Sequence, residues 1–214
     1  MIDSYDKLTV GKFLELRQMD ITGMEEIDIQ VNIIAILNDM DEEEVINLPL
    51  QEYQKLVKQS AFLTSQPTPQ NKIPKILKLN GKQYDVVTDV KDMTAGQYID
   101  YQTYIGYKED KYLPHILSCI IIPKGEKYGQ TDIMTTIKTI EEYLPISVAI
   151  SLSAFFLNRW QSLTKATLTY LILKMKMMMR KEKNMRVKVQ MRQALRKMTT
   201  LRSLIKDGDG LVLP

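Results

Sequence analysis

The sequence has little of the two residue types that most often build metal and redox sites, because it contains one cysteine and one histidine among 214 residues. A single cysteine excludes an internal disulfide framework and any cysteine-rich zinc or iron–sulfur site. A single histidine excludes a metal site built from several histidines. The most apolar stretch, residues 143–157, is too short to span a bilayer, and no apolar segment follows the acidic first residues. We therefore expect cytoplasmic synthesis, no secretory signal and no membrane span.

Motifs that mark the common enzyme classes are also missing. The sequence has no Walker loop, no dinucleotide-binding glycine cluster, no G-x-S-x-G and no H-E-x-x-H. His115 and Cys119 lie four residues apart and could form a thiolate–imidazole pair on one helix face, but in an apolar run such a pair is more often simply buried. Residues 207–210 lack the later carboxylate of a calcium loop and indicate the end of a helix. We expect a non-enzymatic protein with no catalytic, cofactor-binding or metal-binding residues.

Charge is distributed unevenly along the chain. Hydrophobic residues make up 44% of the sequence, which is enough to build a core, and the net charge is only +3. Residues 1–173 carry 17 basic and 23 acidic residues, whereas residues 174–214 carry 12 basic and three acidic residues. Seven of the 13 methionines also lie in residues 174–214. The average charge thus hides an acidic body and a basic, methionine-rich arm.

Apolar spacing and capping residues predict a mainly α-helical fold with one β-hairpin and a long C-terminal helical arm. Asn80-Gly81 lies between two short strand-like segments and predicts a hairpin at about 76–87 with a type I′ turn, because both residues tolerate positive φ. The predicted helices, the first with Thr9 as N-cap, lie at about 9–16, 27–37, 41–45, 51–63, 94–101, 113–122 and 133–142.

Four segments follow from this pattern: an N-terminal helical unit (1–63), a linker with the hairpin (64–92), a second helical unit (93–173) and the basic arm (174–214). Residues 9–15 and 94–100 match in kind at all seven positions, and a Leu-Pro followed by Ser-Ala-Phe recurs later in each helical unit. Two copies of one unit would explain this recurrence, as would the general likeness of helix starts.

Residues 146–207, which include most of the arm and the chain before it, contain neither glycine nor proline, which permits one long helix or two. A heptad frame of apolar residues extends back through Met177, Leu173 and Tyr170, with interruptions at Arg180 and Asn184. We expect a helix on each side of 180–184 and a bend between them. The last part of this frame is a candidate helix-packing stripe that consists of Val187, Met191, Ala194, Met198, Leu201 and Ile205.

The basic residues of the arm are candidate contacts to an anionic partner. Their number exceeds what solubility requires. Like charges at helical spacing repel one another, and an anionic partner would remove this repulsion. DNA or RNA, an acidic protein ring and an anionic membrane all qualify, although the arm lacks aromatic residues that stack on bases. A solvated face around a packed stripe is the alternative interpretation. The candidate residues are Lys174, Lys176, Arg180, Lys181, Lys183, Arg186, Lys188, Arg192, Arg196, Lys197 and Arg202.

Short phrases spread across roughly residues 5–175 lie at 8–13, 36–38, 42–50, 94–100, 121–125 and 155–157. They resemble small tail-gene proteins of tailed bacteriophages and look similar to virion proteins of crAss-like phages of Bacteroides. The resemblance implies a multicopy structural or packaged cargo protein of the portal–tail barrel. Its location would be the virion, and its partners other portal and tail proteins, copies of itself and DNA or an acidic lumen. A tail-assembly chaperone that leaves the finished particle and a sequence-nonspecific nucleic-acid-binding protein are the alternatives.

Overall fold

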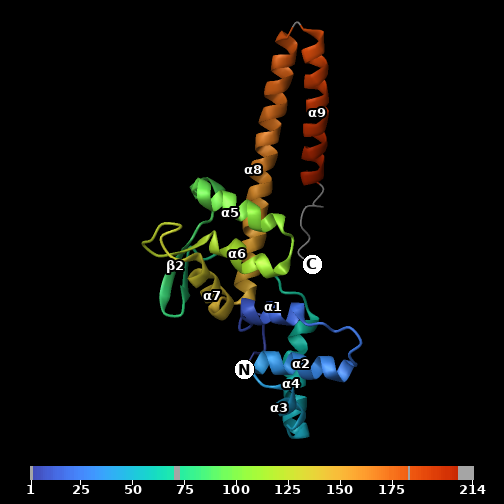
Figure 1. Cartoon of the computed structure of the whole chain (residues 1–214), viewed down its shortest axis with the longest axis vertical. Coiled ribbons are helices and arrows are strands. Elements are labelled where there is room, and N and C mark those ends of the chain that lie inside the picture. The colour runs from blue at the N-terminus through green and yellow to red at the C-terminus, as the bar shows by residue number, and fades with distance from the viewer. Residues whose placement is uncertain (1, 70–72, 183, 207–214) are drawn as a thin grey trace. The chain divides into compact units, whose positions relative to one another are not determined.

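The computed structural model describes residues 2–69, 73–182 and 184–206, without the side chains of 157–167, 201 and 204–206. The chain divides into two compact units, Met1–Phe155 and Phe156–Pro214 (Figure 1). It is mainly helical with a small antiparallel sheet, which confirms the predicted fold class. The α-helices are α1 (Val10–Gln18), α2 (Glu26–Asn38), α3 (Glu42–Ile46), α4 (Leu50–Ser60), α5 (Ala95–Gly106), α6 (Leu113–Ser118), α7 (Ile133–Tyr143), α8 (Ile146–Lys181) and α9 (Met185–Lys206).

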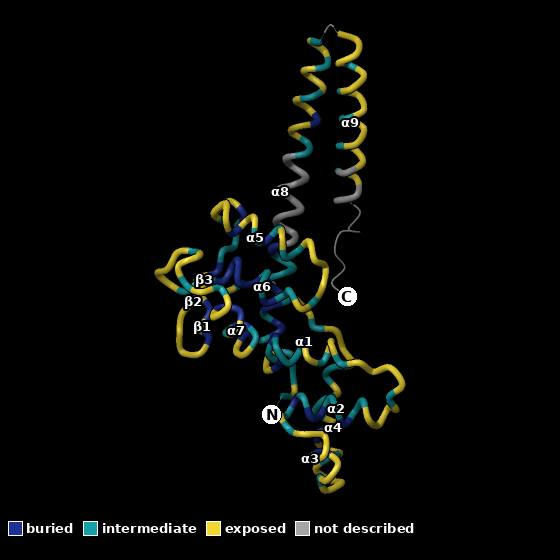
Figure 2. The backbone as a smooth tube through the Cα atoms, viewed as in Figure 1, coloured by how far each residue is buried: buried dark blue, intermediate teal, exposed yellow. Residues whose placement is uncertain are grey.

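Helices α2, α3 and α4 build a small hydrophobic core within the first unit. A capping box starts α3: the Asp41 side chain caps the backbone, and the Asp41 N–H donates to Glu44 Oε2 over 2.9 Å. A short 3₁₀ turn (Ala61–Thr64) follows α4. This core fixes α3 at the edge of the unit, where its acidic residues face solvent (Figure 2). The buried residues of the core are Val31, Ile34, Ala35, Val45 and Leu56.

The predicted hairpin is present as β1 (Ile76–Leu79) and β2 (Lys82–Val86). Asn80 and Gly81 have φ of 46° and 74°, which confirms the type I′ turn. A third strand, β3 (Ile121–Pro123), pairs antiparallel with β2, so that Val86 lies opposite Ile121. The prediction of one helix over 113–122 is therefore wrong, because α6 ends at Ser118 and the apolar run after it completes the sheet.

Helix α7 lies at the centre of the first unit and packs against α1, α6 and the sheet. Its Ile137 and Ile140 are almost completely buried. The chain before α1 is tied to the start of α8: the Val10 N–H donates to the Leu144 carbonyl over 3.0 Å, and the Ile146 N–H donates to the Leu8 carbonyl over 2.8 Å. Segments far apart in sequence thus close one core.

The two similar motifs take up similar local structure in different surroundings. Thr9 and Thr94 are the N-caps of α1 and α5, accepting hydrogen bonds from the N–H groups three residues later. Lys12 donates to the Leu37 carbonyl, whereas Gln97, at the matching position, is buried and donates to the Cys119 carbonyl over 3.0 Å. The shared capping explains the sequence likeness locally, and duplication of a whole unit stays a prediction.

Candidate functional site

The basic arm forms a helical hairpin, by which we mean the part of α8 in the second unit together with α9. Helix α8 ends at Lys181 and α9 begins at Met185, and the two run antiparallel (Figure 1). Asn184 starts α9, since its Oδ1 accepts from the Arg186 N–H over 2.9 Å, and Glu182 Oε1 accepts from the Asn184 N–H over 2.8 Å. The predicted break at 180–184 is confirmed, and it is a complete reversal of the chain.

One face of each helix is turned toward the other helix. On α8 this face contains Ile172, which is only 5% exposed. The less exposed positions recur at three- and four-residue spacing, as expected for paired helices. They are Leu168, Ile172, Met175 and Met179 on α8, and Lys188, Met191, Ala194, Leu195, Met198 and Arg202 on α9.

The packing face of α8 differs from the predicted frame. Tyr170, Leu173 and Met177 belong to that frame, yet they are exposed, at 60%, 55% and 57%. The observed frame is shifted by two residues, which corresponds to roughly 200° around an α-helix. Ile172 and the predicted stripe therefore lie on opposite sides of α8, and the stripe is exposed in the part of the chain that is described.

The predicted stripe of α9 lies mainly on its inner face. Met191, Ala194 and Met198 are half-buried, whereas Val187 is exposed at 36%. The side chains of Leu201 and Ile205 lie outside the described residues.

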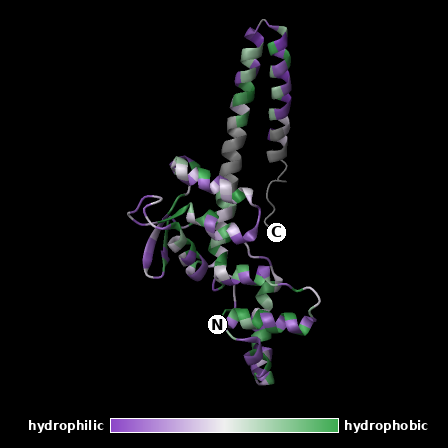
Figure 3. Ribbon diagram, in the orientation of Figure 1, coloured by the Kyte–Doolittle hydropathy of each residue, from purple (hydrophilic) through white to green (hydrophobic). Residues whose placement is uncertain are grey.

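Most of the candidate anion-binding residues are exposed on the outward faces of the two helices. Lys188 and Arg202 are half-buried, and Lys183 lies outside the described residues. Hydrophilic residues cover most of α9, whereas hydrophobic residues recur along α8 (Figure 3). The exposed cations are Lys174, Lys176, Arg180, Lys181, Arg186, Arg192, Arg196 and Lys197.

Cations and apolar side chains meet on one surface, the α8 outer face, which we define as Tyr170, Leu173 and Met177 flanked by Lys174, Arg180 and Lys181. Lys174 Nζ lies 5.9 Å from the centre of the Tyr170 ring, within cation–π range. A hollow of about 390 Å³ is lined by Lys174, Arg180 and Lys181 with Met177 and Met178. In the described part of the chain, none of the three cations has a carboxylate oxygen within 4.0 Å. This surface combines unpaired positive charge with exposed apolar area.

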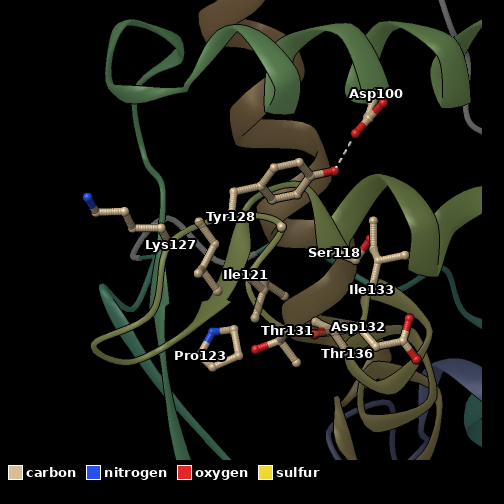
Figure 4. Close-up of a pocket in the computed structure, with 12 residues that line it drawn as sticks. Asp100, Ser118, Ile121, Pro123, Lys127, Tyr128, Thr131, Asp132, Ile133 and Thr136 are labelled. Atoms are coloured by element: carbon tan, nitrogen blue, oxygen red, sulfur yellow. Dashed lines mark hydrogen bonds between the residues drawn. The ribbon is translucent and has the colours of Figure 1, made fainter.

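A second concave feature, of about 350 Å³, lies in the first unit between α5, α6, β3 and α7 (Figure 4). Its polar groups are engaged within the fold. The Tyr128 hydroxyl donates to Asp100 over 2.7 Å, the Ser118 hydroxyl donates to the His115 carbonyl over 2.7 Å, and Asp132 caps α7. The Tyr128–Asp100 bond holds the loop before α7 against α5, and the other two bonds stabilise α6 and the start of α7 locally.

His115 and Cys119 do not form a thiolate–imidazole pair. The Cys119 thiol is completely buried and donates to the His115 carbonyl over 3.4 Å. Burial is the main cause that raises the pKa of the Cys119 thiol to about 12, and the nearby Asp100 adds to it. The thiol is therefore protonated at neutral pH, which makes it a poor nucleophile. The His115 ring packs beside Tyr104 and Tyr112 instead.

Two exposed features carry weak sequence signals. Ile46 and Leu50 are 68% and 69% exposed, and Ile46 lies one turn of α3 from the exposed Glu42 and Glu43. In the sequence these residues are typical of a helix start. The only signal of an exposed apolar surface is that the segment has more apolar residues than its short helices can bury. The outward position of Tyr170 and Leu173 was equally hidden, since both sides of α8 are apolar.

No protein-family model matches the chain, and no curated protein or solved structure matches it significantly. Within the described residues, no helix has both the length and the apolar character that crossing a membrane would require.

Proposed function

We propose that the protein is a non-enzymatic virion protein of a tailed bacteriophage, present in many copies at the portal–tail barrel, with its helical hairpin in contact with an anionic partner surface. The observation that carries this proposal is the α8 outer face, where Lys174, Arg180 and Lys181 surround exposed apolar side chains. Exposed apolar area framed by unpaired charge is typical of a surface that another macromolecule covers. The resemblance of residues 5–175 to phage tail-gene proteins supports the phage assignment.

The first unit supports a structural role. In its cleft, Asp100 accepts a hydrogen bond that ties the loop before α7 to α5, Ser118 and Asp132 hydrogen-bond within α6 and at the start of α7, and the Cys119 thiol is kept protonated. These groups stabilise the fold of the first unit, as a structural role requires.

Mass spectrometry of purified virions tests the proposal. Peptides of this chain should remain after repeated gradient purification and a high-salt wash, at several copies per portal ring. A protein abundant in infected cells but known to stay outside the particle serves as the control for contamination. Loss of the chain together with that control would overturn the virion assignment.

The exposed methionines favour a second candidate, a tail-assembly chaperone. Met177, Met178 and Met185 are 57%, 52% and 66% exposed, and methionine adapts to varied apolar partners. A chaperone would bind a tail protein in the infected cell and be absent from purified particles. The same experiment therefore separates the two candidates.

A further inference from the structure

The α8 outer face limits what can cover it. Tyr170, Leu173 and Met177 follow one another at three- and four-residue spacing, so they form a continuous apolar line. Lys174 and Lys181 lie along one side of this line and Arg180 along the other, as their positions on the helix require. An occupant that matches both features must be apolar in the middle and negatively charged at its sides. A nucleic acid would match the cations but leave the apolar line against a charged backbone.

A surface with these properties exists on the same chain. We define the α3 end as Glu42, Glu43 and Ile46, which share one face of α3 at three- and four-residue spacing, together with Leu50 at the start of α4. Ile46 and Leu50 are the two most exposed large apolar side chains among the described residues. Glu42 and Glu43 are exposed, and neither lies in an ion pair within the described part of the chain. Val45, which lies between Glu43 and Ile46 in the sequence, is buried in the core of α2, α3 and α4. This burial holds the outward residues of α3 in place.

We propose that the α3 end of one copy docks on the α8 outer face of a second copy. Ile46 and Leu50 cover the apolar line of Tyr170, Leu173 and Met177, and the carboxylates of Glu42 and Glu43 meet Lys174, Arg180 and Lys181. Contact between two α8 outer faces is disfavoured, because it would bring six cations together without an anion. This inference rests on the proposed function, whose multicopy role it explains by naming the two surfaces that join the copies.

The two surfaces differ, so the contact is heterologous and leaves one free surface on each end of a pair. Repetition of the contact closes a ring or extends a filament, whereas a contact between identical surfaces would stop at a dimer.

Charge reversal of each surface tests the contact with the full-length chain. Glu42→Lys with Glu43→Lys makes the α3 end basic, and Arg180→Glu with Lys181→Glu makes the α8 outer face acidic. Glu44 is left unchanged because it belongs to the capping box of α3. Matched controls with the same change in charge are Glu126→Lys with Glu142→Lys, and Lys78→Glu with Lys82→Glu, all at exposed positions of the first unit.

Sedimentation velocity and light scattering at low ionic strength measure the outcome. The wild-type chain and both controls should form oligomers larger than dimers, and each test variant alone should associate at least about tenfold more weakly. A mixture of the two test variants should restore oligomers. The basic α3 end of the first variant then meets the acidic α8 outer face of the second, and the acidic α3 end of the second meets the basic α8 outer face of the first. Circular dichroism should show that the variants keep the wild-type helix content.

Four results would overturn the proposal: a monomeric wild-type chain, oligomers that the test variants leave intact, equal losses in the controls, and a mixture that stays dissociated. A monomeric wild-type chain that binds duplex DNA through the same cations would show that the α8 outer face binds nucleic acid, and this result would also overturn the proposal. These results are independent of the virion experiment. A chain that is monomeric but found in purified particles would overturn the docking contact and support the virion role. A chain that forms oligomers but is absent from particles would support the contact and overturn the virion role.

Discussion

The Tyr128 hydroxyl donates a hydrogen bond of 2.7 Å to the Asp100 carboxylate, which ties the loop before α7 to α5. Both partners are partly buried, so water replaces this hydrogen bond poorly. Burial is the main cause, and the bond to Asp100 the second, that raises the pKa of Tyr128 above its ordinary value.

Tyr128→Phe should lower the free energy of unfolding by about 1.5 to 3 kcal/mol, because it removes a hydrogen bond to a charged acceptor. Tyr107→Phe is the matched control, because Tyr107 is 48% exposed, and it should change stability by less than about 0.5 kcal/mol. Urea unfolding followed by circular dichroism measures both variants. Equal stabilities for the two variants would show that the Tyr128–Asp100 bond contributes nothing.

The paired motifs provide a second prediction through Gly11 and Gly96. A Cβ on Gly11 would lie 3.0 Å from the backbone oxygen of Glu141, where α1 crosses α7, whereas a Cβ on Gly96 would have no heavy atom nearer than 4.0 Å. Gly11→Ala should therefore destabilise the chain by about 1 to 3 kcal/mol through overpacking. Gly96→Ala should be neutral or stabilise by up to about 1 kcal/mol, since alanine is the better helix former. The melting temperature should fall for Gly11→Ala and stay the same or rise for Gly96→Ala, and an equal fall in both would contradict the packing argument.

Cys119 predicts a pH dependence of stability above neutrality. The unfolded thiol loses its proton near its ordinary pKa of 9.0, while the folded thiol keeps it up to about pH 12. Ionisation between these values therefore favours the unfolded chain, and this thiol lowers the free energy of unfolding by at most about 1.4 kcal/mol per pH unit. Cys119→Ala lacks this contribution and should show a shallower decline between pH 9 and 11 in urea titrations. Parallel declines in the two proteins would show that the folded thiol ionises normally.

The packing of the helical hairpin predicts very unequal effects for two positions on opposite sides of α8. Ile172→Ala removes a side chain that is 5% exposed and should destabilise the hairpin by about 2 to 5 kcal/mol. Met177→Ala removes a side chain that is 57% exposed and should cost less than about 0.5 kcal/mol in dilute solution. Hydrogen exchange of the α9 amides reports the difference, since the hairpin opens locally when its inner face is weakened. Faster exchange in Met177→Ala than in Ile172→Ala would place α9 on the other side of α8.

Local chemistry made some elements predictable from sequence. Asn80-Gly81 specifies a type I′ turn because both residues accept positive φ, and Thr9 and Thr94 specify helix starts because their hydroxyls cap backbone N–H groups. These features depend on two to four neighbouring residues. Nothing distant in the chain needs to be known.

Other elements depend on partners far along the chain. Ile121 and Ile122 follow an apolar helix without a breaker, and only their pairing with Val86 and Asp85 makes them a strand. Both sides of α8 are apolar, so the sequence could not say that α9 would cover Ile172 and leave Tyr170 outside. The α8 outer face exists because α9 covers Ile172 and leaves Tyr170 exposed. The sequence therefore predicted the individual cations of this surface but not its exposed apolar centre.

The backbone ties between the segment before α1 and the start of α8 set an order on biosynthesis. Leu8 and Val10 are completely buried, and their hydrogen-bonding partners, Ile146 and Leu144, are synthesised more than 130 residues later. During translation these hydrogen bonds therefore cannot form until the start of α8 has been made. The first unit matures late, when the ribosome is already adding the basic hairpin that follows it.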